Sequence, residues 1–231
     1  MSSEELKLIS LCAYLTDVSS PWRGEDHVAS KMVKALKGDP INGYFNYIVA
    51  GQNKRFDQSN IKEFVDRIPP ALARMIARQV DGPATLVPVP NSHVTAINTP
   101  NFRTLELAKL VAAHSKGQLT AVPALVFNAP QQKSREGGPR NAEHFEGAYR
   151  LTQEIRGPIV LLDDVCTSGG HLIGAHRKLQ APTSTIVLAA AFGRSTKEQV
   201  NAPIGVREEM LDLRQPPKDL AEKIRRLLGK T

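Results

Sequence analysis

Hydrophobic residues in the second half of the chain come in short runs that glycine, proline or polar residues bound, and amphipathic segments separate these runs. Short uninterrupted apolar runs are typical of strands buried on both faces, as in a parallel sheet covered by helices. We predict strands within 81–94, 119–127, 159–162 and 184–193, and helices over 102–115 and 170–180. From about residue 80 onward the pattern therefore predicts an α/β fold, a parallel sheet flanked by helices.

The first 80 residues are predicted to form a mainly helical cap. We expect helices over 4–15 and 25–37, a strand or strand pair within 42–51, an exposed polar segment at 54–60, and a helix over 60–80. Pro69 and Pro70 should interrupt the last of these, because proline is tolerated in the first turn of a helix but not inside it. Residues 81–200 are the predicted core, and 201–231 a basic tail with a helix over 216–230.

Composition fits an ordinary globular protein. Of the 231 residues, 41% are hydrophobic and 23% charged, and the longest apolar runs are far too short to cross a bilayer. No basic segment followed by an apolar one opens the chain, and Cys12 and Cys166 lack metal-ligand spacing, so we expect a cytoplasmic protein with two free thiols. The net charge of +7 suits a polyanionic ligand, whereas 5% aromatic residues argue against a platform for stacked single-stranded nucleic acid.

The segment "PIVLLDDVCTSGGHL", 158–172, combines features of a ligand site. An apolar run leads into Asp163 and Asp164, and a loop of small residues follows, in which Thr167 and Ser168 are possible helix caps. Glycine lets backbone N–H groups approach a ligand, and a helix N-terminus favours an anion. Carboxylates beside such an anion site suit a ligand that carries both a phosphate and a sugar diol, or a bound Mg²⁺. An ordinary solvated turn is the alternative, but the coincidence of strand, acids, small loop and helix favours the ligand site.

The same segment resembles the phosphoribosyl-pyrophosphate signature of type I phosphoribosyltransferases. Other segments agree in order: "LVPVPNSHV" with the family's pyrophosphate loop, and "PNFRTLELAKLVA" and "QQKSREGGPRNAEHFEGAYRL" with the helix and flexible loop of ComF-like members. The last segment begins within 128–147, which we predict to be a long polar loop, and continues into the strand that follows; such loops are usually functional or disordered. The resemblance covers roughly 84–195, about half of the chain.

The resemblance implies a reaction and a set of site residues. The family transfers a ribosyl phosphate from its pyrophosphate to a nitrogen acceptor with Mg²⁺, and Asp163 and Asp164 would engage the ribose hydroxyls, directly or through the metal. Catalytic roles would fall on Asp163, Asp164 and Arg140. The donor would be bound by Val165, Cys166, Thr167, Ser168, Gly169, Gly170 and His171 at the 5′-phosphate, by backbone N–H groups of Pro90, Asn91 and Ser92 at the pyrophosphate, and by Arg135 or Arg140 from the flexible loop.

His171 departs from the family pattern, which has a hydroxyl residue there. An imidazolium could bind phosphate, so that donor affinity falls as pH rises through the imidazole range; the larger side chain could instead accommodate a substituted 5′-phosphate, or simply point to solvent. The cysteine cluster of many ComF proteins is absent from this sequence, and Pro100-Asn101 replaces their Arg-Gly pair. The alternatives are therefore a phosphoribosyltransferase fold kept as an inactive regulator or effector, and a nucleic-acid-associated accessory protein. The identity of the nitrogen acceptor and the formation of a homodimer are left open by the sequence. No membrane association is expected.

Overall fold

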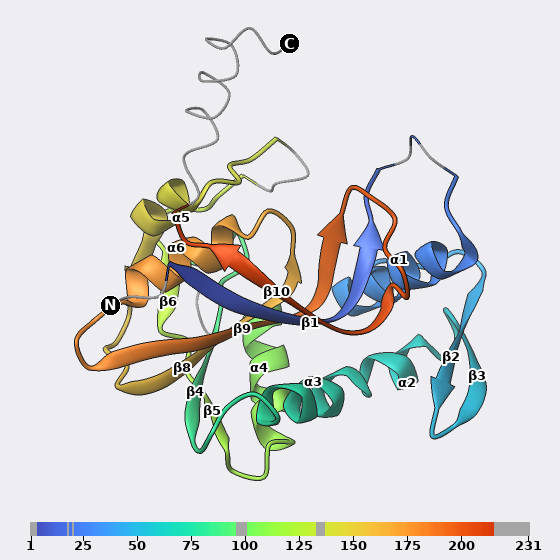
Figure 1. Cartoon of the computed structure of the whole chain (residues 1–231), viewed down its shortest axis with the longest axis horizontal. Helices are drawn as coiled ribbons and strands as arrows, with labels where there is room; N and C mark the ends of the chain where they lie inside the picture. Colours follow the sequence, from blue (N-terminus) through green and yellow to red (C-terminus); the bar gives the residue numbers. More distant parts are fainter. Residues whose placement is uncertain (1–3, 18, 20, 96–100, 133–136, 215–231) are drawn as a thin grey trace, which may run out of the picture.

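A six-stranded sheet with helices on both faces forms the centre of the molecule (Figure 1). The computed structural model describes residues 4–17, 19, 21–95, 101–132 and 137–214. From edge to edge the strands are β10 (Ile204–Asp212), β1 (Glu5–Leu15), β9 (Ser184–Thr196), β8 (Gly157–Cys166), β4 (Ala84–Pro88) and β5 (Leu119–Ala121). Neighbours pair in parallel, except that β10 is antiparallel to β1. This confirms the predicted α/β class with a mostly parallel sheet.

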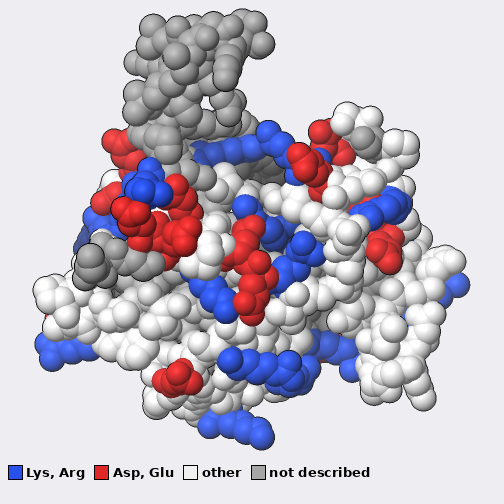
Figure 2. Space-filling view, in the orientation of Figure 1, with Lys and Arg blue, Asp and Glu red and all other residues white. Residues whose placement is uncertain are grey.

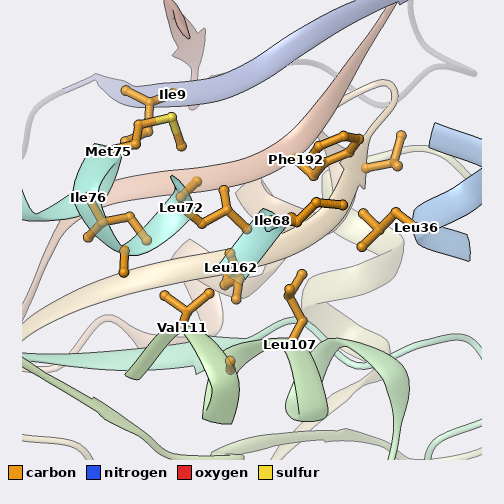
Figure 3. Close-up of a cluster of buried hydrophobic side chains, with 14 of the residues drawn as sticks. Ile9, Leu36, Ile68, Leu72, Met75, Ile76, Leu107, Val111, Leu162 and Phe192 are labelled. Atoms are coloured by element: carbon orange, nitrogen blue, oxygen red, sulfur yellow. The ribbon is translucent and has the colours of Figure 1, made fainter. Parts of the chain in front are cut away.

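The helices divide between the two faces of the sheet. One face is covered by α1 (Gly24–Lys37), α2 (Ile61–Val65), α3 (Ile68–Ala77) and α4 (Arg103–Ala113). The other is covered by α5 (Ala142–Ala148) and α6 (Gly170–Leu179). Two separate hydrophobic clusters result, one on each face, and Figure 3 shows side chains of α3 and α4 converging on Leu162 of β8 in the first of them. Burial of these apolar surfaces is the main force that holds the layers together.

Two small sheets complete the fold. β2 (Tyr44–Val49) and β3 (Gln52–Asp57) form a hairpin. Of the two predictions for 42–51, a single strand or a strand pair, the strand pair is confirmed. The predicted exposed segment at 54–60 is wrong at Phe56, whose side chain is fully buried against other aromatic rings under the hairpin. β6 (Leu125–Phe127) pairs with β7 (Tyr149–Leu151).

The predicted helix over 4–15 is wrong, because this segment is strand β1 in the interior of the main sheet. Leu8 and Ile9 are adjacent and both almost completely buried, each in the hydrophobic cluster of a different face. A strand with β9 on one side and β10 on the other can bury successive residues on opposite faces. A surface helix would leave one of the two exposed.

Three further boundaries differ from the sequence analysis. The predicted strand within 119–127 is two strands, β5 and β6, which belong to different sheets. The predicted loop over 128–147 contains all of α5 except its last residue, and this helix buries Ala142 and Phe145 one helical turn apart. Residues 204–212, assigned to the basic tail, form strand β10 of the main sheet, while the helix predicted over 216–230 lies outside the described residues.

The other predicted elements are confirmed. They are α1, β4, α4, β8, α6, β9, and the helical segment within 60–80, which the structure divides into α2 and α3 with Pro69 and Pro70 in the first turn of α3. Among the helices described, none has the length and apolar character needed to span a membrane.

Candidate functional site

A cavity of about 610 Å³ opens at the carboxyl ends of β1, β4, β8 and β9. In parallel sheets this edge is where ligands bind, because strand ends there lead into loops and helix N-termini. Most of the predicted site residues line this one cavity, namely Pro90, Asn91, Ser92, Arg140, Asp163, Asp164, Val165, Cys166, Thr167, Gly169 and His171. Arg135 lies outside the described residues.

The acid pair lies near the carboxyl end of β8 and is almost completely buried. Asp163 and Asp164 keep 8% and 6% of their surface exposed. One carboxylate oxygen of Asp163, Oδ1, accepts the backbone N–H of Asp164 at 2.8 Å. Burial, and next the charge of Asp164, raise the pKa of the Asp163 carboxyl well above its usual range, while the Lys37 ammonium acts in the opposite direction. A buried acid of this kind is held ready for a cation or a hydroxyl donor.

Arg103, the first residue of α4, pairs with the acid pair, and the sequence analysis missed it. Its Nε donates to Oδ2 of Asp164 at 2.8 Å, and its Nη2 donates to the same oxygen. The two residues are 61 positions apart, so only the fold brings them together. The one local signal is a basic residue in the first turn of a helix, where the helix dipole disfavours it.

The N-terminal strand and helix also contribute to the cavity. Tyr14 and Thr16 come from the end of β1 and the residue after it, and Lys37 and Asp39 from the end of α1 and the turn that follows. Burial, and next the charge of Asp164, raise the pKa of Tyr14 to about 12, so this hydroxyl stays protonated. These residues add polar and charged groups to the lining of the cavity.

The small loop after β8 is held by neighbouring segments. Arg194 of β9 donates from Nη1 to the carbonyl of Thr167, and its Nε is paired with Glu209 of β10. Burial raises the pKa of the Cys166 thiol to about 12, so Cys166 is a small packing residue rather than a nucleophile. Strand β10, which the sequence analysis assigned to the tail, thus helps to fix the loop after β8, because its Glu209 pairs with Arg194.

Of the two expected helix caps, Ser168 contacts the start of α6 and Thr167 does not. Gly169, with a left-handed φ of 83°, occupies the N-cap position of α6. The Ser168 hydroxyl oxygen accepts the N–H of Gly170, the first residue of the helix, at 3.4 Å, and the hydroxyl donates to the carbonyl of Arg140 at 2.8 Å. An added Cβ on Gly170 would lie 2.2 Å from the same carbonyl oxygen. Ser168 and Gly170 therefore hold the segment of Arg140 against α6.

The loop after β4 is tied to α4. The side-chain oxygen of Asn91 accepts the N–H of Thr104 at 3.4 Å, and the backbone carbonyl of Asn91 accepts the N–H of Val94 at 2.9 Å. Pro90 has no N–H, so the predicted donation from this loop can come only from Asn91 and Ser92. The N-terminus of α4 and this loop face the cavity together.

His171 packs against aromatic rings at the edge of the cavity. Its ring centroid lies 3.8 Å from that of Phe145 and 6.2 Å from that of Phe127. The pKa of His171 is lowered to about 4, chiefly by burial; the charge of Asp164 acts in the opposite direction, and the nearby His144 adds to the lowering. The expectation of a side chain pointing to solvent is wrong, whereas the expected pH dependence of donor affinity stays a prediction, because it concerns the protein with a phosphate bound.

We expect His171 to make the fold sensitive to acid. Its pKa in the folded protein is below the ordinary 6.5, so its contribution to stability is complete above pH 6.5 and is lost as pH falls toward 4. Over that window wild type should lose up to about 3 kcal/mol relative to His171→Gln. Thermal melts of both proteins between pH 4 and 7.5 measure the difference. His114→Gln, at the exposed end of α4, is the control and should follow wild type; a His171→Gln curve parallel to wild type would contradict the expectation.

Comparison of the sequence with known proteins finds no matching family profile and no matching curated protein. Among solved structures, orotate phosphoribosyltransferase from Aeropyrum pernix has 15% identity and a TM-score of 0.36, covering 72% of this chain and 83% of that one. Adenine phosphoribosyltransferase from Rhodothermus marinus has 10% identity and a TM-score of 0.39, covering 71% and 87%. Adenine phosphoribosyltransferase from Trypanosoma brucei has 12% identity and a TM-score of 0.38, covering 91% and 95%.

These neighbours are phosphoribosyltransferases, but at such identities and TM-scores the likeness does not carry an argument about this chain. None of the three is a ComF-like protein, so that closer likeness stays a prediction.

Proposed function

We propose that this protein binds a ribosyl pyrophosphate together with Mg²⁺ and transfers its ribosyl phosphate to a nitrogen acceptor. One observation carries the proposal: a buried pair of carboxylates opens into the same cavity as two arginines and two loops that begin at strand ends. Carboxylates accept hydrogen bonds from a sugar diol, and guanidinium groups and backbone N–H groups bind phosphate. Few other small ligands require both kinds of group in one cavity.

The donor set suits Mg²⁺ that arrives with its substrate. The described residues contain no group of three or more His, Cys, Asp or Glu side chains able to hold a metal ion. Mg²⁺ usually keeps several waters and binds one or two carboxylates plus substrate phosphates, and Asp163 and Asp164 offer those carboxylates. When bound, the ion would neutralise charge on the pyrophosphate.

Each part of the cavity has a role in the proposed reaction. Asp163 and Asp164 hold the ribose hydroxyls, the loop from Thr167 to His171 holds the 5′-phosphate, and Asn91, Ser92 and Arg140 hold the pyrophosphate. The bond from the anomeric carbon to the pyrophosphate oxygen breaks, and the oxygen leaves with the electron pair. The acceptor nitrogen supplies the pair for the new bond and gives up a proton. Stabilising charge on the departing group is the main contribution that the protein can make to such a step.

The nucleic-acid alternative finds less support. Figure 2 shows acidic and basic side chains intermingled on the face over β1 and β10. Ion pairs of Lys7 with Glu208 and of Arg194 with Glu209 account for part of this mixture. A surface of alternating sign attracts a polyanion less than a continuous basic stripe does.

Calorimetry with 5-phosphoribosyl 1-pyrophosphate tests the proposal. We expect binding with Mg²⁺ present and much weaker binding without it, followed by release of pyrophosphate when a suitable nitrogen acceptor is added. Binding with no pyrophosphate release from a broad acceptor panel would favour the inactive regulator. The absence of both heat and thermal stabilisation at millimolar donor would remove the proposal.

A further inference from the structure

Asp164 already holds a cation that the chain itself supplies. Two nitrogens of Arg103 donate to the single oxygen Oδ2 of Asp164, and both residues line the cavity. Asp164 is buried, whereas the Arg103 side chain is 44% exposed. The guanidinium therefore covers the carboxylate from the open side of the cavity.

The backbone at Arg103 is fixed relative to the loop after β4. The Thr104 hydroxyl, fully buried, donates to the carbonyl of Val89 at 2.5 Å, and the Thr104 N–H donates to Asn91. Arg103 is thus anchored between the acid pair and the loop at Asn91 and Ser92, and only its long side chain is free to change direction.

The charges of the site make Arg103 and a divalent cation competitors. When both acids are ionised, the pair with Arg103 in place carries one net negative charge, and without Arg103 it carries two, which a divalent cation neutralises. A cation that takes Oδ2 must displace two hydrogen bonds, and the displaced guanidinium is then repelled by the cation.

We infer that Arg103 competes with a divalent cation for Asp164, and that cation binding releases its guanidinium toward the loop at Asn91 and Ser92. There it would meet the phosphates of the donor. This second step, from released guanidinium to bound phosphate, rests on the function proposed above. Arg103 is then a positioning residue for Asp164 in the empty site and a phosphate ligand in the loaded one. The exchange makes cation binding and donor binding cooperative.

Binding of Mn²⁺ alone, followed by the electron paramagnetic resonance signal of the free ion, tests the competition without any donor. We expect Arg103→Gln to bind Mn²⁺ about tenfold more tightly than wild type, because the competing charge is gone. Lys109→Gln is the matched control, since it removes one positive charge from the exposed surface of the same helix, where Lys109 pairs with Glu106. It should bind Mn²⁺ as wild type does. Equal affinity of all three proteins, or undetectable binding by all three, overturns the inference.

A second variant and a second ligand complete the test. Arg103→Met keeps the aliphatic stem of the side chain and is used in place of Arg103→Gln if that variant melts below the assay temperature. The same tenfold gain in Mn²⁺ affinity is expected. With Mg²⁺ saturating, Arg103→Gln should bind 5-phosphoribosyl 1-pyrophosphate about tenfold more weakly than wild type, and unchanged donor affinity overturns the release toward the phosphates. A gain in Mn²⁺ affinity with no donor binding by any protein supports the competition and rejects the proposed function. Donor binding by wild type without that gain rejects the competition alone.

Discussion

Asp163→Asn is expected to stabilise the folded protein while it abolishes Mg²⁺-dependent donor binding. The folded-state pKa of Asp163 is raised above the unfolded value of 3.8, so this carboxyl stabilises the fold only while it is protonated. That stability is complete below pH 3.8 and is lost as pH rises through the folded pKa, because burial disfavours the charged form. Asparagine removes the charge and keeps the oxygen that accepts the N–H of Asp164.

Thermal melts and calorimetry measure the two effects. A gain of about 1–2 kcal/mol would raise Tm at pH 7 by roughly 2–8 °C, since each kcal/mol moves the Tm of a protein of this size by about 2–4 °C. The gap between variant and wild type should close as pH falls toward 4. Asp81→Asn, in the exposed turn before β4, should change neither Tm nor donor affinity. A less stable Asp163→Asn protein at pH 7 would contradict this account of the acid pair.

Gly170→Ala is expected to destabilise the protein severely, although alanine is the better helix former. The new Cβ would lie 2.2 Å from the carbonyl oxygen of Arg140 and 2.8 Å from its carbon, and neither α6 nor the Arg140 segment can give way without moving backbone. We expect a loss of at least about 2 kcal/mol and a Tm lower by roughly 5 °C or more. Donor affinity should fall too, because Arg140 lines the cavity.

Gly147→Ala is the matched control for this steric argument. Gly147 is a helical glycine in α5, and an added Cβ there has no neighbour within 4 Å. The substitution should be neutral or stabilising by up to about 1 kcal/mol, the ordinary gain in helix propensity. Equal Tm changes in the two variants would mean that the contact with Arg140 does not matter.

The sequence predicted those elements whose pattern is complete within a few residues. β8 and β9 are short apolar runs with clear ends, and α4 has a regular apolar stripe. β1 could not be recognised in this way, because its nearly continuous apolar residues suit a helix or a strand, and the choice is made by partners about 180 residues away. β10 is charged and half exposed, and it becomes a strand because β1 needs a partner on that edge.

The sequence predicted where the candidate site lies, but only part of what its individual residues do there. The motif around Asp163 led to residues that line one cavity, since strand ends in a parallel sheet meet at one edge. It could not reveal Arg103, whose relation to Asp164 exists only in space. The motif also could not show that Ser168 and Gly170 hold the Arg140 segment. A small residue can have this role only where another segment's backbone comes close to it, and the sequence does not show that approach.

The position of β1 also bears on how the chain reaches its native state. Of the strands described in the main sheet, β1 comes first along the chain, and it pairs with β9 and β10, the last two. The edge of β1 that pairs with β9 has no native partner until about residue 196 has left the ribosome, and the edge that pairs with β10 none until about residue 212; closing so long a loop delays the nucleus of the sheet. Through that interval an apolar strand is exposed to other chains, so early release from the ribosome or truncation before β10 leaves an aggregation-prone segment uncovered. The strand that contributes Tyr14 to the cavity is therefore also a segment that needs protection during biogenesis.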